Sequence, residues 1–301
     1  MKVYINRRPV VGPWGGGNKL VHELSKKIEQ EGDQVFFDLN RSDFDILFCV
    51  DPRPDDRGIW YKHLLNYKEQ FGTKIIHRVG DLGTHGKPEL LDLVKQCLPF
   101  SDHIIFPSFW AKEFSGFKGD NYTVIQNRPK QIFYRFKKNK KPKKPFKIVT
   151  HHWSNNPKKG FDIYSFLDEN LSDKFQFTYI GRVPDGFSFK NSTYVPPIID
   201  EEIAKQLSQN DIYLSASREE AGANHVLEAM ACGLPVLYHS EGGSIGEYVS
   251  DRGLAFDGKI DILSKLEMMI EKFDLYKDSC LSYNEKISTT VQKYIEVICQ
   301  I

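Results

Sequence analysis

No charge of one sign predominates in this sequence, and it contains no long apolar run. In 301 residues, Lys and Arg total 41 and Asp and Glu total 40, so the formal net charge is +1. A general nucleic-acid binder usually has a strong basic excess, so this balance argues against nucleic acid as a partner. No stretch approaches the roughly 20 apolar residues that a helix needs to cross a bilayer. Residues 1–8 turn polar too early for a signal peptide.

Cysteine is scarce, and no two cysteines form a C-x-x-C pair. Their odd number and wide spacing argue against a disulfide framework and against a metal site. We therefore expect reduced thiols in the core of a cytoplasmic protein. The five residues are Cys49, Cys97, Cys232, Cys280 and Cys299.

Short apolar runs alternate with amphipathic stretches along the whole chain. Strands separated by helices pair in parallel through right-handed crossovers, so the pattern predicts doubly wound α/β domains. The expected strands are 3–5, 35–37, 46–50, 75–77, 104–106, 122–125, 147–150, 175–180, 212–214 and 235–238. Helical spacing of apolar residues is typical of 20–28, 90–94, 161–167, 201–207, 226–232 and 283–301.

A lysine-rich run at 135–145 contains two prolines and interrupts this pattern. Like charges repel one another, so we expect the run to be a solvated linker between domains. It would also attract an acidic membrane surface weakly through Lys137 to Lys144. The predicted domains are 1–140 and 146–282, followed by a closing helix at 283–301. In open α/β sheets ligands bind beyond the carboxyl ends of the strands, so both domains should direct their loops at a shared cleft.

The most informative segment is 215–236, in which an expected strand leads through a small-residue loop into a helix. Glu220 precedes Gly222 in that loop, and Glu228 lies about one turn inside the helix that begins near Asn224. Backbone N–H groups at a helix start can bind an anion. Carboxylates only accept hydrogen bonds, and sugar or ribose hydroxyls are natural donors to them. The alternative is structural: one acid complements the helix dipole and the other lies on a polar surface.

Glu220 and Glu228 are separated by seven residues, and the chain continues EAMACGLPV from Glu228. This resembles the E-x(7)-E signature of the family-4 retaining glycosyltransferases, which have the GT-B fold. Further segments resemble the same family over nearly the whole chain. They are PKKGFD at 157–162, YIG at 179–181, GGSIGE at 242–247, IHRVGD at 76–81, PSF at 107–109 and VIQN at 124–127. The resemblance implies two Rossmann-like domains facing a cleft, with the first binding an acceptor and the second a nucleotide sugar. It also implies that the closing helix at 283–301 returns to the first domain.

The resemblance also implies residue roles in the second domain. Glu228 would bind ribose hydroxyls, Glu220 would contact the donor sugar near the reacting carbon, and Lys159 would neutralise the phosphates. A fixed cation and helix-start amides stabilise the charge that the leaving diphosphate gains. The donor-binding loop would consist of Ala221, Gly222, Ala223 and Asn224. A plain turn with a helix-start lysine is the alternative for Lys159.

One residue departs from the family pattern. The family usually places an arginine five residues before the lysine, where this chain has Ser154. A second phosphate cation would then come from Arg182 or Arg218, or hydrogen bonds from Ser and Asn would replace it. Val195 lies in the expected base pocket at 194–197, where backbone groups can read uracil or guanine. His151 and His152 end an expected strand and are either ligands or satisfied structural groups.

Acceptor-side candidates follow the first-domain strands. The glycines at 15–17 precede a helix and let backbone approach a ligand closely. The family resemblance implies that Gly16 and Gly17 border the donor phosphates and the acceptor. We expect Asp81, with His77 next, to supply a hydrogen-bonding group or base near the acceptor hydroxyl. The acceptor-binding candidates are Asp51, Arg53 and Arg78, with Asp55 and Asp56 nearby.

Asp43 and Asp45 form a D-x-D pattern, which holds a metal in some glycosyltransferases. The pair precedes its strand, whereas a metal loop should follow one, so we expect a solvated strand entry and no metal. The sequence thus predicts a metal-independent retaining glycosyltransferase without a cofactor. Its donor would be a UDP-sugar or GDP-sugar, and its acceptor a glycan or lipid-linked molecule. A sugar-nucleotide epimerase, a phosphorylase-like enzyme, an inactive partner subunit and a non-catalytic sugar-binding protein are the alternatives.

Overall fold

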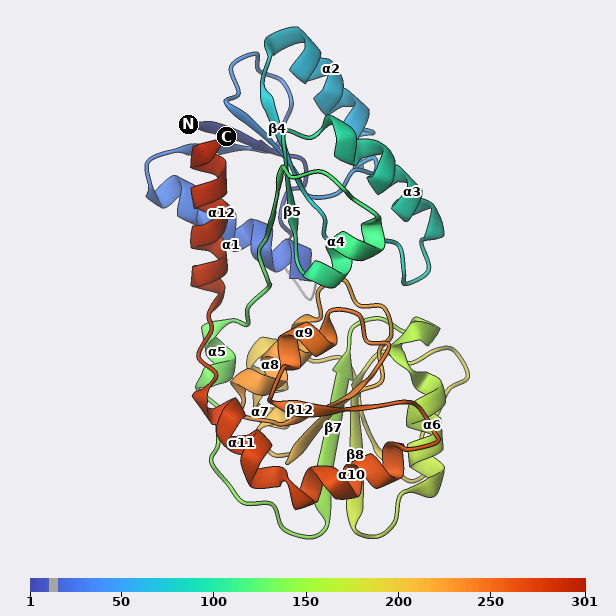
Figure 1. The fold of residues 1–301 in the computed structure, drawn as a ribbon. Coiled ribbons are helices and arrows are strands. Elements are labelled where there is room, and N and C mark those ends of the chain that lie inside the picture. The colour runs from blue at the N-terminus through green and yellow to red at the C-terminus, as the bar shows by residue number, and fades with distance from the viewer. Residues whose placement is uncertain (11–15) are drawn as a thin grey trace. The chain divides into compact units, whose positions relative to one another are not determined.

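A computed structural model describes residues 1–10 and 16–301 of the chain. These residues divide into two compact units (Figure 1). The first unit contains Met1–Asn127 and Ile287–Ile301, and the second contains Arg128–Lys286. Each unit is built on one six-stranded sheet.

All strand pairs of the first sheet are parallel, and the strand order is β2-β1-β3-β4-β5-β6. The strands are β1 (Lys2–Ile5), β2 (Gln34–Phe36), β3 (Ile46–Cys49), β4 (Lys74–Arg78), β5 (His103–Phe106) and β6 (Tyr122–Val124). The helices are α1 (Gly16–Gln30), α2 (Tyr61–Phe71), α3 (Pro88–Cys97), the 3-10 helix η1 (Leu98–Phe100), α4 (Phe109–Ser115) and α12 (Ile287–Gln300).

Both faces of this sheet are apolar, which is why helices cover both. On β3, Ile46 and Phe48 pack with α1 and α12, whereas Leu47 and Cys49 pack with α2. Successive side chains of a strand point to opposite faces, so a strand buried on both sides reads as a continuous apolar run. This explains why the sequence predicted strands from short unbroken apolar runs.

The second sheet is also parallel throughout, with the order β12-β11-β10-β7-β8-β9. Its strands are β7 (Phe146–His152), β8 (Phe175–Gly181), β9 (Thr193–Val195), β10 (Ile212–Ser215), β11 (Val236–His239) and β12 (Gly253–Phe256). Its helices are α5 (Gln131–Tyr134), the 3-10 helix η2 (Pro157–Lys159), α6 (Phe161–Asn170), α7 (Asp200–Leu207), α8 (Asn224–Ala231), α9 (Ile245–Val249), α10 (Ile262–Glu271) and α11 (Phe273–Ser282).

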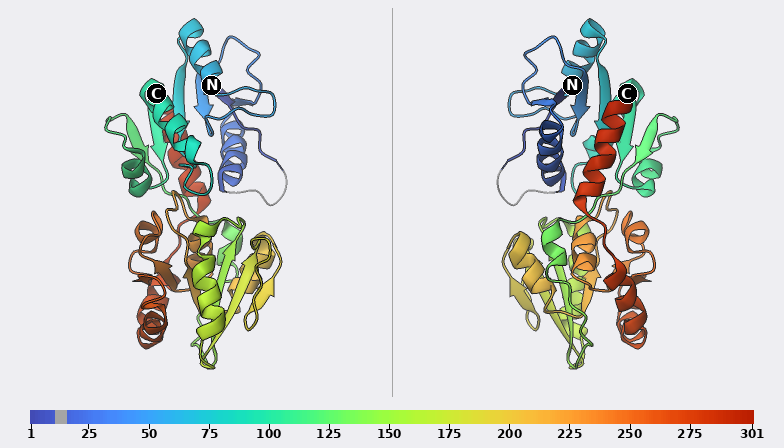
Figure 2. Two further views of the ribbon diagram at one scale, coloured as in Figure 1. Left: turned by 90° about the vertical axis from the view of Figure 1, so that its right-hand side faces the viewer. Right: turned by 90° about the vertical axis from the view of Figure 1, so that its left-hand side faces the viewer.

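Helices lie on both sides of the second sheet as well (Figure 2). Val149 and Tyr213 pack in one core cluster with residues of α7, α8 and α9. Ile148 and Leu214, one residue away on the same strands, pack in the other cluster with α6 and α10. The predicted doubly wound parallel architecture is therefore confirmed for both units.

The boundary between the units lies earlier than the lysine run. The second unit begins at Arg128, not at 140–146. Phe133 is fully buried in the core of the second unit, and Lys137 Nζ donates to the Leu281 carbonyl at 3.0 Å. The lysine run is therefore not an unpacked linker. Apolar residues before the run pack into the second unit and hold the run against it.

The closing helix α12 belongs to the first unit. Val291, Tyr294 and Ile298 join the core formed by α1 and the sheet. Thr290 Oγ1 also donates to the Gln126 carbonyl at 3.0 Å, which ties the start of α12 to the last residues of the first segment. The two segments of this unit are thus joined by both packing and a hydrogen bond.

All five cysteines are free thiols, and four of them are buried. Cys299 is exposed, so the expectation of a core position was wrong for this residue. It lies on the outward side of α12, whose buried residues include Ile295 and Ile298. Within residues 1–10 and 16–301, no helix is both long and apolar enough to span a bilayer.

Candidate functional site

The loop between β10 and α8 forms the centre of the candidate site in the second unit. Glu220 lies in this loop and Glu228 lies inside α8. Both carboxylates are buried, with relative exposures of 8% and 6%. A buried carboxylate is costly unless it is paired, so the partners of these acids define what the site can do.

Glu228 is paired with a histidine at the carboxyl end of β7. Its Oε2 lies 2.9 Å from His151 Nε2. Because a carboxylate only accepts, we assign the proton to Nε2. His151 Nδ1 then accepts from the Tyr213 hydroxyl, at 3.1 Å. The chain Tyr213–His151–Glu228 therefore fixes the carboxylate from two neighbouring strands.

Glu220 is paired with Lys159 at the end of η2, through Oε1 and Nζ. Its backbone is held by the loop after β11: Glu220 N donates to the Gly242 carbonyl at 3.2 Å and Ser244 N donates to the Glu220 carbonyl at 2.8 Å. Gly243 has a φ of +68°, and a Cβ there would lie 2.6 Å from the Glu220 carbonyl oxygen. Only glycine allows this close approach, so the two glycines at 242–243 (the GG loop) have a structural function beside Glu220.

His225, a residue that the sequence analysis did not single out, lies within the same group of side chains. It is half-buried on the first turn of α8, and its Nε2 lies 2.9 Å from Ser215 Oγ. Its ring centroid is 4.9 Å from that of His152 and 6.4 Å from that of His151. Burial lowers the His225 pKa to about 3, so the ring is neutral at physiological pH. Its place in the segment from Ser215 to Val236 was the signal that could have found it.

His152 also has a polar partner, because its Nε2 lies 2.7 Å from the Tyr164 hydroxyl. The same hydroxyl accepts from the backbone N–H of Ala216 at 3.2 Å, at the start of the central loop. His151 and His152 are thus buried side chains with hydrogen-bond partners inside the protein. This favours a structural role for both over a role as ligands. They position the loop and Glu228 from the end of β7.

The two arginines proposed as a second phosphate cation differ in their surroundings. Arg218 forms two hydrogen bonds with the Asp162 carboxylate, at 3.2 and 3.1 Å. Arg182 lies after β8, and its guanidinium stacks on the Trp153 ring 4.1 Å from the centroid. Since Asp162 neutralises Arg218, Arg182 is the better candidate. Ser154 Oγ accepts from the Asn156 N–H at 3.2 Å, so it shapes the loop that leads to Lys159.

Part of the predicted amide cradle is already engaged. The Ala223 N–H donates to Ser244 Oγ at 3.3 Å, although the residue lies directly before α8 as expected. Gly222 and Asn224 flank it in the loop and at the first position of the helix. Val195 ends the edge strand β9 and is half-buried, at the same carboxyl edge of the sheet.

Several acceptor-side candidates form ion pairs in the first unit. Asp51 follows β3 and binds Arg53 Nη2 at 2.6 Å through Oδ2. Burial tends to raise the Asp51 pKa, but its hydrogen bonds from Arg53 outweigh this and the pKa is lowered. Arg7 Nη2 lies 3.6 Å from the same carboxylate. Asp51 and Arg53 therefore form a prearranged polar pair beyond the carboxyl end of β3.

The two β4 candidates, His77 and Arg78, are both buried, and they differ in their surroundings. His77 has a relative exposure of 0%, and burial lowers its pKa to about 4. Such a position disfavours it as a base for a substrate hydroxyl. Arg78 is the last residue of β4. Its Nη1 lies against Gly80, because a Cβ added to Gly80 would be only 1.9 Å from this nitrogen. The same nitrogen would lie 3.6 Å from a Cβ on Gly17, which places Arg78 beside the start of α1.

Asp81 is the accessible acid of this group. Its Oδ2 lies 3.0 Å from Lys87 Nζ, and its Oδ1 accepts from the Gly83 N–H at 2.9 Å. Gly16 and Gly17 form the first residues of α1. Gly15 lies outside the described residues.

Asp43 and Asp45 lie at the amino end of β3, as the sequence predicted. Asp43 is paired with Arg41 at 2.8 Å and with Lys2, and hydrogen bonds from both hold its pKa well below the usual range. Asp45 Oδ2 accepts from the Lys2 N–H at 2.6 Å. In the part of the chain that the structure describes, no group of three or more His, Cys, Asp or Glu side chains is arranged to hold a metal.

Comparison with known proteins finds a family model that matches part of the second unit. Residues 167–270 match the model of the family described as "Glycosyl transferases group 1". This match includes Glu220, Glu228 and the GG loop. Among curated proteins, no sequence matches the chain.

Solved structures resemble the whole chain at low sequence identity. Anabaena Alr3699/HepE, solved with UDP and glucose, has a TM-score of 0.72 at 13% identity, covering 100% of this chain and 99% of that one. The lipopolysaccharide outer core galactosyltransferase WaaB has a TM-score of 0.71 at 14% identity, with 100% and 99% covered. WaaG, a glycosyltransferase involved in lipopolysaccharide biosynthesis, has a TM-score of 0.67 at 12% identity, with 99% of both chains covered. The chain thus has the GT-B fold and contains a glycosyl transferases group 1 domain.

Proposed function

We propose that this protein is a glycosyltransferase that moves a sugar from a nucleoside-diphosphate sugar to an acceptor hydroxyl with retention of configuration. The observation that carries the proposal is the pair of buried acids, Glu220 and Glu228, each held by a basic residue at the carboxyl end of the second sheet. The match of residues 167–270 to a glycosyltransferase family supports it. So does the presence of UDP and glucose in the similar Anabaena structure.

Each residue of the proposed donor site has a distinct task. Glu228, fixed by His151, accepts hydrogen bonds from the two ribose hydroxyls. Glu220 accepts from a hydroxyl of the donor sugar, and Lys159 then turns from Glu220 to the diphosphate. After this exchange Lys159 is paired with the diphosphate and Glu220 is hydrogen-bonded to the sugar, so neither buried charge lacks a polar partner. Arg182 supplies a second cation near the phosphates.

The proposed reaction exchanges one bond for another. The bond between the anomeric carbon and the β-phosphate oxygen breaks, and the acceptor oxygen bonds to that carbon on the same face. The acceptor proton passes to the leaving β-phosphate, whose new charge Lys159 and the helix-start amides stabilise. No protein carboxylate has to act as a nucleophile, since the acceptor oxygen attacks the anomeric carbon directly and Glu220 is engaged with a hydroxyl of the donor sugar. Asp81 is the first unit's candidate to orient the acceptor hydroxyl, and Asp51, Arg53 and Arg78 are its candidates to bind the acceptor.

We propose a UDP-sugar as the donor, with a GDP-sugar as the alternative. A panel of nucleotide sugars tests this through the rise in melting temperature that each produces. The preferred donor is then incubated without acceptor, and rapid NMR reads the anomer released by slow hydrolysis. A released sugar of inverted configuration would refute retention, and a panel without any stabilising nucleotide would refute the donor site. The acceptor, a glycan or a lipid-linked molecule, and a cytoplasmic location stay predictions.

A further inference from the structure

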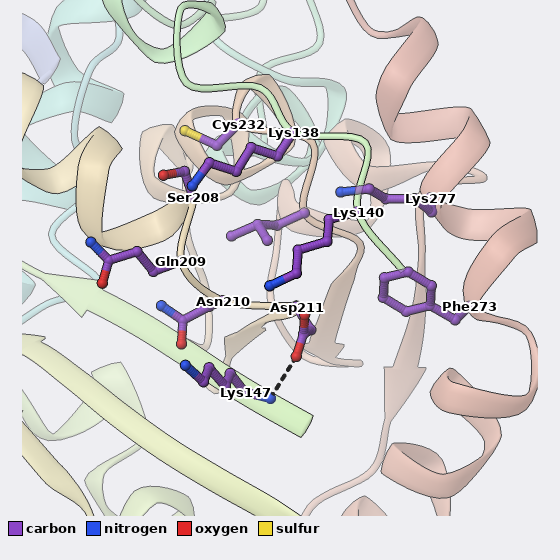
Figure 3. Close-up of a pocket in the computed structure, with 11 residues that line it drawn as sticks. Lys138, Lys140, Lys147, Ser208, Gln209, Asn210, Asp211, Cys232, Phe273 and Lys277 are labelled. Atoms are coloured by element: carbon purple, nitrogen blue, oxygen red, sulfur yellow. Dashed lines mark hydrogen bonds between the residues drawn. The ribbon is translucent and has the colours of Figure 1, made fainter. Parts of the chain in front are cut away.

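A lysine-lined pocket lies at the amino ends of the strands of the second sheet. Its volume is about 200 Å³. Figure 3 shows its lining residues, which come from the segment before β7, from β7, from the loop before β10, from the residues around 232–234 and from α11. Typical sites for drug-sized ligands measure roughly 300–1,000 Å³, so this pocket suits a smaller molecule.

The pocket lies at the amino ends of the strands, whereas the candidate donor site lies at their carboxyl ends. Lys147 is the second residue of β7, whereas His151, which holds Glu228, is close to the end of the same strand. Four residues of extended strand separate them by about 13 Å. Asp211 likewise precedes β10, whose carboxyl end leads into the loop of Glu220. A ligand in this pocket therefore cannot contact the donor-site acids.

Four ammonium groups and one carboxylate line the pocket, which gives its wall a net charge of +3 if all are ionised. The lysines are Lys138, Lys140, Lys147 and Lys277. In residues 1–10 and 16–301, none of the four forms a salt bridge. Like charges held this close repel one another unless an anion joins them.

Asp211 does not neutralise the cluster. Its Oδ2 accepts from the Lys147 backbone N–H at 2.9 Å, so part of its acceptor capacity is used by the sheet edge (Figure 3). Burial raises the Asp211 pKa, despite the opposing charges of Lys140 and Lys147. The pocket therefore keeps a positive excess that this acid only partly offsets.

Lys277 is the buried member, with a relative exposure of 6%. Its Nζ donates to the Gly233 carbonyl at 2.6 Å, just beyond the end of α8. An ammonium has three donors, so this bond leaves capacity for a ligand. Burial lowers the Lys277 pKa, and an anion in the pocket would favour the charged form of this lysine. A buried ammonium beside three exposed ones is typical of a site shaped for an anion.

We propose that this pocket binds a phosphate group, either free or as the headgroup of an acidic lipid. A phosphate carries a charge of about −1.5 to −2 and three acceptor oxygens, which matches several lysine ammoniums better than a single carboxylate does. Lysine binds phosphate as a mobile point charge and needs no fixed fork geometry. The proposal does not depend on the glycosyltransferase activity, because it concerns the other edge of the sheet.

Titration of the full chain with inorganic phosphate, followed by NMR of backbone amides, tests the location. The amide signals of Gln209, Asn210 and Asp211 should shift with a saturable dependence on phosphate. The signals of the loop at 222–224 report any phosphate at the donor end separately. Unchanged signals at 209–211 up to saturation of the donor end would overturn the proposal.

Two matched double variants test the mechanism. Lys140→Gln with Lys147→Gln removes two charges from the pocket wall, whereas Lys143→Gln with Lys144→Gln removes two exposed charges nearby that do not line it. The first pair should weaken phosphate binding at least about tenfold and the second less than about twofold, because only the first removes direct charge-assisted contacts. Equal weakening would show diffuse attraction to the lysine run and overturn the pocket.

Vesicles distinguish the two sources of phosphate. Sedimentation with vesicles of phosphatidic acid and phosphatidylcholine, lost in Lys140→Gln with Lys147→Gln and retained in the control pair, would assign a lipid headgroup. Phosphate binding without sedimentation would assign a free phosphate. Sedimentation that both pairs reduce equally would mean that the lysine run, not the pocket, holds the membrane.

Discussion

His151 Nε2 lies 2.9 Å from Glu228 Oε2, and both side chains are only 8% exposed. The histidine comes from the end of β7 and the acid from α8, 77 residues later in the chain. The contact therefore joins β7 of the sheet to α8, the helix that follows the candidate donor-binding loop.

Replacement of Glu228 should weaken donor binding. Glu228→Gln keeps the size of the side chain but removes the negative charge that accepts hydrogen bonds from the ribose hydroxyls. Each such charge-assisted hydrogen bond contributes on the order of 1.5–3 kcal/mol. We expect UDP affinity to fall about tenfold to a hundredfold by calorimetry. His151→Leu should give a similar loss, because it removes the hydrogen bond from His151 Nε2 that holds the buried carboxylate in place. Wild-type affinity in both variants would contradict the assigned site.

Glu220 should matter more for turnover than for affinity. Its expected contact is with the donor sugar near the reacting carbon, where interactions that strengthen in the transition state raise kcat. Glu220→Gln should therefore lower kcat of donor hydrolysis by about tenfold or more with a smaller change in KM. The neighbouring Glu219→Gln is the control, since Glu219 pairs with Lys158 on a partly exposed surface. An equal effect of both variants on kcat would count against Glu220.

Arg182 and Arg218 should behave differently. Arg218 is neutralised by Asp162, whereas the guanidinium of Arg182 lies on Trp153 at the carboxyl end of the sheet. Arg182→Gln should weaken UDP binding by about 1 kcal/mol or more, and Arg218→Gln by less than about half of that. Calorimetry on the two variants compares them directly. The reverse order of affinities would make Arg218 the phosphate ligand.

Stability should fall in mild acid partly because of His77. Its folded pKa is about 4, below the usual value of 6.5, so the unfolded chain binds the proton first as pH falls. The contribution of His77 to the free energy of unfolding is therefore fully present above about pH 6.5. It falls as the pH drops toward 4, by up to about 1.4 kcal/mol per pH unit. His77→Leu should flatten this dependence by about 2 kcal/mol between pH 7.5 and pH 5, measured by urea denaturation. Parallel pH curves for the two proteins would exclude a neutral buried His77.

Activity should survive removal of metal ions. Asp43 and Asp45 are engaged with Arg41 and Lys2 at the amino end of β3, away from the strand ends that carry the other candidates. Donor hydrolysis in the presence of EDTA should therefore match the untreated rate. Loss of activity that Mn²⁺ restores would revive these two acids as metal ligands.

Elements with strong local patterns were predictable, whereas the two edge strands of the second sheet were not. The buried run from Ile46 to Cys49 is apolar throughout, so its strand was evident. The edge strands β9 and β12 have three and four residues, and only some of these are apolar or buried. Such strands form because a neighbouring strand offers free backbone groups, which no local pattern reveals. The domain boundary at Arg128 was missed for a related reason, since Phe133 is buried only by residues distant in sequence.

The sequence by itself determined the architecture of both units and singled out Glu220 and Glu228 as candidates for the donor site. It could do so because apolar periodicity and a long motif are local properties of the chain. The tertiary structure alone decided the partners: His151 for Glu228, Lys159 for Glu220 and Asp162 for Arg218. It also buried His77 and gathered Lys140, Lys147 and Lys277 around one pocket. Parallel strands bring residues that are distant in sequence to one edge of a sheet, and burial then sets the charge and accessibility of each group.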